Sequence, residues 1–213
     1  SKGLYYVCDF LTGQECEQVI SFATPDRLAR SPLTGGKATD GGFYHGTHRT
    51  SSTCPLLFAS MYLPLIEQLR DKHPEYIPEL ELSWEITQRA AKLLQAEPSH
   101  LEPLQMIKYM PGEYYKKHHD HKGFYNPEDG YPDRSKTLLV FLNNVERGGH
   151  LRFDVLGLEF IPQRGDAVVW SNIHETTGKV DPDLIHQGLP PEPGSNPKYA
   201  MNVWIRDEPI ELT

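Results

Sequence analysis

The sequence has few cysteines, no long apolar run and no clustered positive charge, and each shortage excludes a class of protein. Three cysteines, Cys8, Cys16 and Cys54, are too few for a disulfide framework. We expect three buried thiols, and the alternative is a single bridge in a secretory protein. The longest apolar stretches have the length of strands, so no segment is predicted to cross a membrane. The chain opens at Ser1 without a signal peptide, which is typical of a trimmed terminus.

The charge balance is acidic. Aspartate and glutamate outnumber lysine and arginine by 29 to 21, and the formal net charge is −8. The longest basic cluster is the pair Lys116-Lys117, whereas proteins that bind nucleic acid usually carry a basic patch or stripe. We therefore expect neither nucleic acid nor a membrane as a partner. At 213 residues the chain is long enough for a complete core, and residues 1–213 are predicted to form one domain.

Helical patterns precede strand patterns along the chain. A short strand is predicted over 4–7, and the capping-box residues Thr12 and Glu15 predict a helix that runs to about Phe22. Apolar residues at helical spacing predict two further helices, over 55–72 and 82–95. A polar strand is predicted over 48–52. Residues 29–46 are rich in Gly, Ser, Thr and Asp and are predicted to form a loop.

From residue 104 onward, short runs of strand character alternate with turn residues. They cover 104–110, 114–120, 137–142, 150–153, 158–161, 167–170 and 199–205. Many short strands at regular spacing favour a sandwich, a barrel or a jelly roll. Together with the earlier helices they predict an α+β fold, in which a double-stranded β-helix (jelly roll) carries supporting N-terminal helices on one sheet face.

Three side chains match the donor set of a non-haem iron(II) site. His118 and Asp120 are two positions apart in a predicted strand, so their side chains point to the same side. With the distant His186 they form the two-histidine, one-carboxylate set that caps one face of the metal and leaves other positions open. The sequence therefore predicts oxygenase chemistry at these residues.

Other histidines are weaker candidates. His174 also follows a strand, but it lies in a polar turn, and no basic residue follows it as Lys198 follows His186. His119 and His121 are predicted to face the opposite side of the strand, where the sequence offers no nearby carboxylate. We interpret both as packed or surface imidazoles.

The last predicted strand carries a lysine and a tryptophan on one face. Lys198, Ala200, Asn202 and Trp204 alternate with the other residues at a period of two, so they share a face. An unpaired charge inside a barrel is costly. An inward lysine at this position is therefore expected only if a polar ligand fills the barrel.

The order of these motifs resembles the prolyl 4-hydroxylase family of Fe(II)- and 2-oxoglutarate-dependent dioxygenases, the collagen, algal and viral type. The resemblance covers nearly the whole chain. It rests on four stretches: Arg49-Thr50-Ser51, the Tyr-x-x-Gly-x-x-Tyr-x-x-His-x-Asp run from Tyr109 to Asp120, Arg134-x-x-Thr137, and His186 to Lys198 with Trp204 beyond it.

The resemblance implies hydroxylation of prolyl residues in peptides or proteins, with Fe(II), 2-oxoglutarate, O2 and ascorbate as cofactors and succinate and CO2 as products. His118, Asp120 and His186 would be the catalytic metal ligands. Lys198 would pair with the distal carboxylate of 2-oxoglutarate and Tyr109 would donate to it. Asn202 would replace a hydroxyl donor that is absent because Phe141 stands where the family has tyrosine. The residues expected to contact the peptide are Tyr115, Arg134, Trp204, Arg49 and Ser51.

Alternatives stay open at this point. The chain could be an oxygenase of a lysyl side chain, a free amino acid or an oxygen-sensing peptide, although Lys198 speaks against the lysyl and oxygen-sensor branches. It could also be a zinc hydrolase or a metal-binding jelly roll without catalysis. The loops over 35–46 and 123–132 are expected to close over a peptide. The compartment is the endoplasmic reticulum if the protein is of the collagen type and the cytoplasm otherwise.

Overall fold

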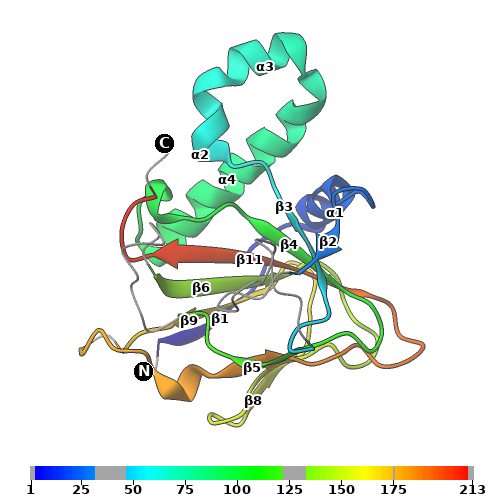
Figure 1. Ribbon diagram of the computed structural model, residues 1–213, viewed down its shortest axis with the longest axis vertical. Helices are drawn as coiled ribbons and strands as arrows, with labels where there is room; N and C mark the ends of the chain where they lie inside the picture. Colours follow the sequence, from blue (N-terminus) through cyan, green and yellow to red (C-terminus); the bar gives the residue numbers. More distant parts are fainter. Residues whose placement is uncertain (1–2, 32–46, 122–132, 175, 211–213) are drawn as a thin grey trace, which may run out of the picture.

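The computed structural model in Figure 1 describes residues 3–31, 47–121, 133–174 and 176–210. The two loops that the sequence predicts to be lids, at 35–46 and 123–132, lie outside these residues. The described strands form two antiparallel sheets. The large sheet has seven strands in the order β1-β9-β6-β11-β4-β3-β2, and the small sheet has four in the order β5-β10-β7-β8.

The bounds of the elements are as follows. The large sheet consists of β1 (Leu4–Val7), β9 (Ala167–Ser171), β6 (Arg134–Phe141), β11 (Lys198–Arg206), β4 (Gln105–Tyr109), β3 (Ser52–Pro55) and β2 (Ala29–Arg30). The small sheet consists of β5 (Tyr115–His118), β10 (His186–Gly188), β7 (Leu151–Phe153) and β8 (Leu158–Phe160). The helices are α1 (Gly13–Phe22), α2 (Ala59–Tyr62), α3 (Ile66–Lys72) and α4 (Ile77–Leu94).

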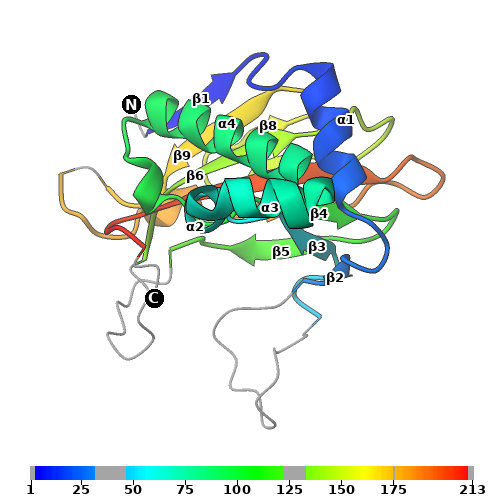
Figure 2. The same cartoon turned by 90° about the horizontal axis from the view of Figure 1, so that it is seen from above.

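The central strands of the large sheet are largely buried on both faces, which gives the molecule two cores. Figure 2 shows the helices lying over one face of this sheet, and Figure 1 shows β5 and β8 of the small sheet on its other side. On β6, Leu138 and Val140 belong to the core beneath the helices, whereas Leu139 and Phe141 belong to the core between the sheets. The period of two thus sends alternate side chains into different cores. The result confirms the predicted jelly roll with helices on one sheet face.

Several local predictions are confirmed. The capping box of α1 is present, because the Glu15 backbone N–H donates to Thr12 Oγ1 at 3.2 Å and the Thr12 N–H donates to Glu15 Oε2 at 2.7 Å. The strand predicted over 4–7 is β1. Among the described residues, no helix is both long and apolar enough to traverse a bilayer.

Other local predictions are wrong. The polar strand predicted over 48–52 is absent; Arg49 forms an isolated bridge with Tyr115, and β3 begins at Ser52. Helix α4 begins at Ile77 rather than at residue 82, because buried Ile77 and Leu80 extend its apolar face. The three cysteines are free, and Cys8 is exposed instead of buried.

The buried carboxylate of Glu79 in α4 binds Arg27, which precedes β2, and Leu57, which follows β3. Glu79 is 3% exposed and accepts two hydrogen bonds from Arg27, at 2.6 and 2.9 Å, and one from the backbone N–H of Leu57 at 2.8 Å. The carboxylate therefore joins three parts of the chain that are distant in sequence.

We expect Glu79→Leu to lower the free energy of unfolding by about 3 kcal/mol, because removing one partner of a buried ion pair leaves the other charge uncompensated. Urea denaturation measures the change. The matched control is Arg70→Ala, which breaks the exposed pair between Arg70 and Glu81 and is expected to cost less than about 1 kcal/mol. Equal stabilities of the Glu79 variant and the wild type would contradict the role given to this carboxylate.

Candidate active site

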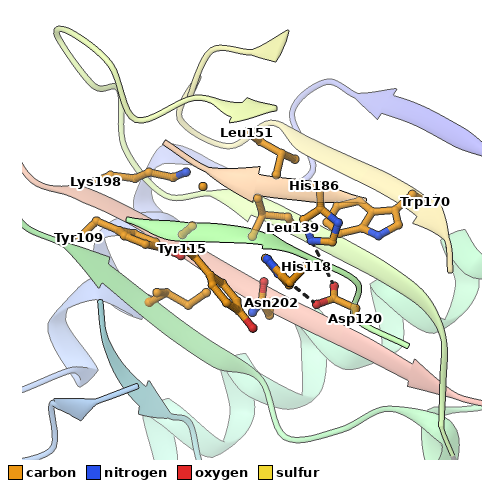
Figure 3. A pocket seen from close by; sticks show the side chains of 13 residues that line it. Tyr109, Tyr115, His118, Asp120, Leu139, Leu151, Trp170, His186, Lys198 and Asn202 are labelled. Carbon is orange, nitrogen blue, oxygen red and sulfur yellow. Dashed lines mark ion pairs between the residues drawn. The ribbon is translucent and has the colours of Figure 1, made fainter. Parts of the chain in front are cut away.

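A pocket with an empty volume of about 410 Å³ lies between the inner faces of the two sheets. Figure 3 shows the side chains that line it. Leu139 of β6, Leu151 of β7 and Trp170 of β9 contribute apolar walls, and the polar and charged groups come from β4, β5, β10, β11 and Asp120. The pocket therefore combines a low-dielectric surround with a few polar groups, as binding sites in proteins usually do.

Three potential metal-ligating side chains converge in this pocket. His118 ends β5 and His186 begins β10, and the two residues are directly opposite each other in the antiparallel ladder. Asp120 follows two residues after the end of β5. Its Oδ1 lies 3.6 Å from His118 Nε2, and its Oδ2 lies 3.8 Å from His186 Nε2. One atom from each residue lies within 4.8 Å of the other two, which is a spacing that can hold a metal ion.

The backbone fixes how both imidazoles face the centre. His118 Nδ1 is 2.8 Å from the carbonyl oxygen of Lys116, and His186 Nδ1 is 3.0 Å from that of Leu184. A carbonyl oxygen only accepts, so each Nδ1 carries the proton and donates. The lone pair of each Nε2 is therefore directed at the space beside Asp120. This is the tautomer that metal-ligating histidines need.

Asp120 is held by donors that the sequence-based reasoning did not identify as its partners. Thr137 Oγ1 donates to Asp120 Oδ2 at 2.8 Å, and the Trp204 indole N–H donates to the same oxygen at 3.2 Å. Asn172 Nδ2 in turn donates to Thr137 Oγ1 at 3.0 Å. Thr137 and Trp204 are cross-strand partners on β6 and β11. The sequence signal was their inward position on two strands, but the register that joins them is not visible from sequence.

The charge states at the triad suit a cation. Burial alone would raise the pKa of Asp120, but a hydrogen bond that His118 donates through Nε2 when its ring is protonated, and the charges of the protonated His186 and His118 rings, hold that pKa far below its usual range. Burial, reinforced by the charge of His118, lowers the pKa of His186 to about 4. At neutral pH the carboxylate is ionised and the His186 ring is neutral, as metal ligation requires.

Lys198 places a positive charge at the other end of the pocket. It begins β11 and is 2% exposed. Its Nζ lies 5.3 Å from the ring centre of Tyr109 and 5.7 Å from that of Phe141. No carboxylate among the described residues pairs with it. Burial lowers the pKa of Lys198 to about 7. An anion bound beside the ammonium would offset this desolvation.

Two arginines expected to contact a peptide stack on aromatic rings. The Arg49 guanidinium lies 4.8 Å from the ring centre of Tyr115, which stacks on His118 at 3.5 Å. Arg49 Nε donates to Ser51 Oγ at 2.9 Å, and one terminal nitrogen of Arg49 is buried without a hydrogen-bond partner in the described part of the chain. Tyr115 and His118 line the pocket, whereas Arg49 and Ser51 do not.

Arg134 and Trp204 form the second stacked pair. The guanidinium lies 3.4 Å from the centre of the indole and donates to both carboxylate oxygens of Glu102, at 2.6 and 2.9 Å. Neither side chain is among those that line the pocket. Glu102 was not predicted as part of the site, because only the folded chain shows that it fixes Arg134.

The other histidine candidates have different surroundings. His174 is exposed, and its Nδ1 lies 2.9 Å from Thr176 Oγ1, away from the triad. The prediction that His121 has no nearby carboxylate is wrong, because its Nδ1 lies 3.3 Å from Asp133 Oδ2. Asp133 is distant in sequence from the predicted strand, so the strand pattern alone could not reveal this pair.

Comparisons with known proteins agree with the site. Residues 104–206 match a family model described as the 2OG-Fe(II) oxygenase superfamily. The chain is 28% identical over 214 residues to prolyl 4-hydroxylase 1 of Arabidopsis thaliana, an alignment that covers 94% of this chain and 67% of that protein. It is 32% identical over 119 residues to the human prolyl 4-hydroxylase subunit alpha-3, covering 54% of this chain and 21% of that subunit.

A solved structure supports the fold along the whole chain. The viral collagen prolyl hydroxylase of Paramecium Bursaria Chlorella virus-1, in its 2OG complex, superposes with a TM-score of 0.66 at 22% identity. The superposition covers 97% of each chain. The chain therefore has the same architecture as that protein, and its match to the human subunit spans about a fifth of that subunit's length.

The lowered pKa of Lys198 predicts a pH-dependent stability. The unfolded chain holds the Lys198 proton up to about pH 10.5, and the folded chain releases it near pH 7. Between these values unfolding takes up a proton, so the free energy of unfolding of the wild type rises with pH. Lys198→Met should therefore stabilise the metal-free protein most at pH 6. This advantage should shrink by about 1.4 kcal/mol per pH unit between pH 7.5 and 9.5.

Urea denaturation of both proteins across pH 6 to 9.5 (roughly the window given by the two pKa values) measures the difference. The matched control is Lys117→Met, because the Lys117 side chain is 55% exposed. We expect the control to show no such slope. A Lys198→Met advantage that is constant over the range would mean that Lys198 keeps its proton in the folded protein.

Proposed function

Because the chain belongs to the 2OG-Fe(II) oxygenase superfamily and, within it, to the prolyl 4-hydroxylase family, we propose that it hydroxylates prolyl residues of peptides or proteins. The reaction consumes O2 and 2-oxoglutarate and releases succinate and CO2. The proposal rests on one observation, which is that two features occur in the same pocket. The triad of His118, Asp120 and His186 faces a buried ammonium group, that of Lys198 (Figure 3).

The donor set at the triad fits Fe(II). Two imidazoles and one carboxylate hold this ion in many oxygenases and leave the remaining positions for co-substrate and oxygen. We assign His118, Asp120 and His186 as the catalytic metal ligands. When bound there, Fe(II) with 2-oxoglutarate and O2 supplies the oxidising chemistry, and the protein supplies position, charge and the exclusion of water.

The co-substrate requires a cation at a fixed distance from the metal ligands. We assign Lys198 to the distal carboxylate of 2-oxoglutarate, since a charge-assisted hydrogen bond satisfies the buried ammonium. Tyr109 lies opposite Lys198 in the β4–β11 ladder and also lines the pocket, so we assign its hydroxyl to the same carboxylate. Asn202, on the same inner face as Lys198, is the third co-substrate group.

The side of the site that we assign to the peptide consists of aromatic rings, and arginine side chains stack on them. We propose that Tyr115 and Trp204 pack against the target prolyl ring, and that Arg134 and Arg49 hold these aromatic rings in place. The stacked guanidinium groups fix the orientation of both rings. Arg49 and Ser51 are themselves buried, at 5% and 0% exposed, so we assign both to the support of Tyr115 rather than to direct contact with the peptide.

The test is incubation of the protein with Fe(II), 2-oxoglutarate, ascorbate and a panel of peptides, with succinate release and peptide mass as readouts. We expect poly-proline or collagen-like peptides to gain the mass of one oxygen atom on proline. We also propose ascorbate as the accessory reductant, so turnover should decline sooner without it. Succinate release stimulated by lysyl peptides or free amino acids, with no oxidised proline, would contradict the prolyl specificity.

We expect His118→Ala and Asp120→Ala to abolish this turnover, because each removes one of three ligands. The matched control is His174→Ala, which removes an exposed histidine outside the triad and should leave turnover unchanged. Near-normal hydroxylation by either triad variant would show that the assigned ligands are wrong.

The hydrogen bond from Thr137 to Asp120 yields a prediction on metal affinity. Thr137→Val keeps the shape but removes the donor, so the carboxylate loses one of its two fixed contacts on Oδ2. We expect the affinity for Co(II), measured by calorimetric titration, to fall ten- to a hundredfold. Thr137→Ser restores the hydroxyl and should restore the affinity. If the valine variant binds Co(II) as tightly as the wild type, Thr137 does not position the ligand.

A further inference from the structure

Asn202 carries a carboxamide that opens onto the pocket and has no hydrogen-bond partner among the described residues. The residue is 8% exposed and lines the pocket, and its side chain makes no hydrogen bond to any described residue. Buried polar side chains in folded proteins are nearly always hydrogen-bonded, so such a group at a pocket wall points to a ligand. The carboxamide offers two N–H donors and one carbonyl acceptor.

The neighbouring amide does not explain this arrangement. Gln105 of β4 is the cross-strand partner of Asn202, and directly opposite residues on one face are close enough to interact. Yet Gln105 Oε1 is itself buried without a hydrogen-bond partner, so the two amides do not satisfy each other. Gln105 does not line the pocket, whereas Asn202 does. The two side chains therefore form a natural pair for comparison.

The position of Asn202 on β11 shows which end of the pocket its side chain lines. Lys198 and Asn202 share the inner face of β11 and are four residues apart, which separates their Cα atoms by about 13 Å along the strand. In Figure 3, Lys198 lies beside Tyr109 at one end, and Asn202 lies beside His118 and Asp120 at the other. The polar groups of the pocket are thus divided between two ends.

We infer that Asn202 donates a hydrogen bond to the 2-oxo-acid end of the co-substrate, next to the metal ligands, while Lys198 and Tyr109 hold its distal carboxylate. The inference rests on the proposed function and goes beyond it, because it assigns the two ends of one ligand to different residues. The oxygens of a 2-oxo acid only accept hydrogen bonds, so the Asn202 NH2 group is the donor. Asn202 is then a positioning residue that sets how the oxo acid meets the metal.

The test compares 2-oxoglutarate binding by the anaerobic Fe(II) protein in the wild type, Asn202→Leu and Lys198→Met. The visible charge-transfer absorption of a 2-oxo acid chelated to Fe(II) reports the metal end directly, and its titration gives the affinity. For Asn202→Leu we expect roughly a tenfold weaker affinity, the worth of one hydrogen bond to a charged group, and a shifted band at saturation. For Lys198→Met we expect a larger loss of affinity and an unshifted band.

Two further variants keep the result interpretable. Gln105→Leu alters the neighbouring amide and should leave both affinity and band unchanged. Asn202→Asp keeps the shape of the side chain but opposes the co-substrate's charge, so it should weaken 2-oxoglutarate binding more than leucine does without weakening Fe(II) binding.

The other possible outcomes would overturn either the inference or the proposed function. An unshifted band and wild-type affinity in both Asn202 variants would overturn the inference while leaving the proposed function intact. The same changes in Gln105→Leu as in Asn202→Leu would assign the effect to core packing and overturn it as well. A wild type that shows no band with Fe(II) and 2-oxoglutarate would overturn the proposed function, and the inference with it.

Discussion

The pairing of His118 with His186 across two short antiparallel strands is the contact on which the site depends. β5 has four residues and β10 has three, so few ladder bonds fix their register. A slip of β10 by one residue would turn the His186 imidazole to the other face of the sheet, away from His118. The register is reinforced from outside, because β10 also pairs with β7 and Arg49 bridges to Tyr115 at the start of β5. The small sheet thus acts as the frame for two metal-ligating side chains.

The large sheet supplies the enclosed polar side chains of Lys198 and Asn202. Its central strands β6, β9 and β11 are largely buried on both sides, so the inward residues Lys198 and Asn202 of β11 are enclosed. A protein selected only for stability would have apolar side chains at these two positions. Asp120 and Lys198 carry opposite charges in the same pocket, yet neither neutralises the other. The interior therefore contains charged side chains that do not pair with each other, and the extensive surrounding core makes this arrangement stable. A bound dicarboxylate would complete it.

Periodic features of the fold could be predicted from the sequence, and features created by pairing could not. The capping box at Thr12 and the strand-rich second half depend on local patterns, and both predictions are confirmed. β10 has three residues, too few for any period, so the strand that contains His186 escaped prediction. The hydrogen bonds of Asp120 depend on the β6–β11 register, and the ion pair of His121 joins it to Asp133, which lies outside the predicted strand. Such contacts arise from tertiary structure and leave no local signal.

Trp204 links the metal side of the site to the peptide side. Its indole N–H donates to Asp120, and its ring face carries the Arg134 guanidinium, which Glu102 fixes through two hydrogen bonds. The carboxylate that completes the triad and the arginine behind the peptide pocket are therefore attached to the same rigid ring. A peptide that moved Trp204 on binding would change the orientation of Asp120, because a side chain in a packed interior does not shift without displacing its partners. If the peptide contacts Trp204 as proposed, substrate binding and metal geometry are coupled through this residue.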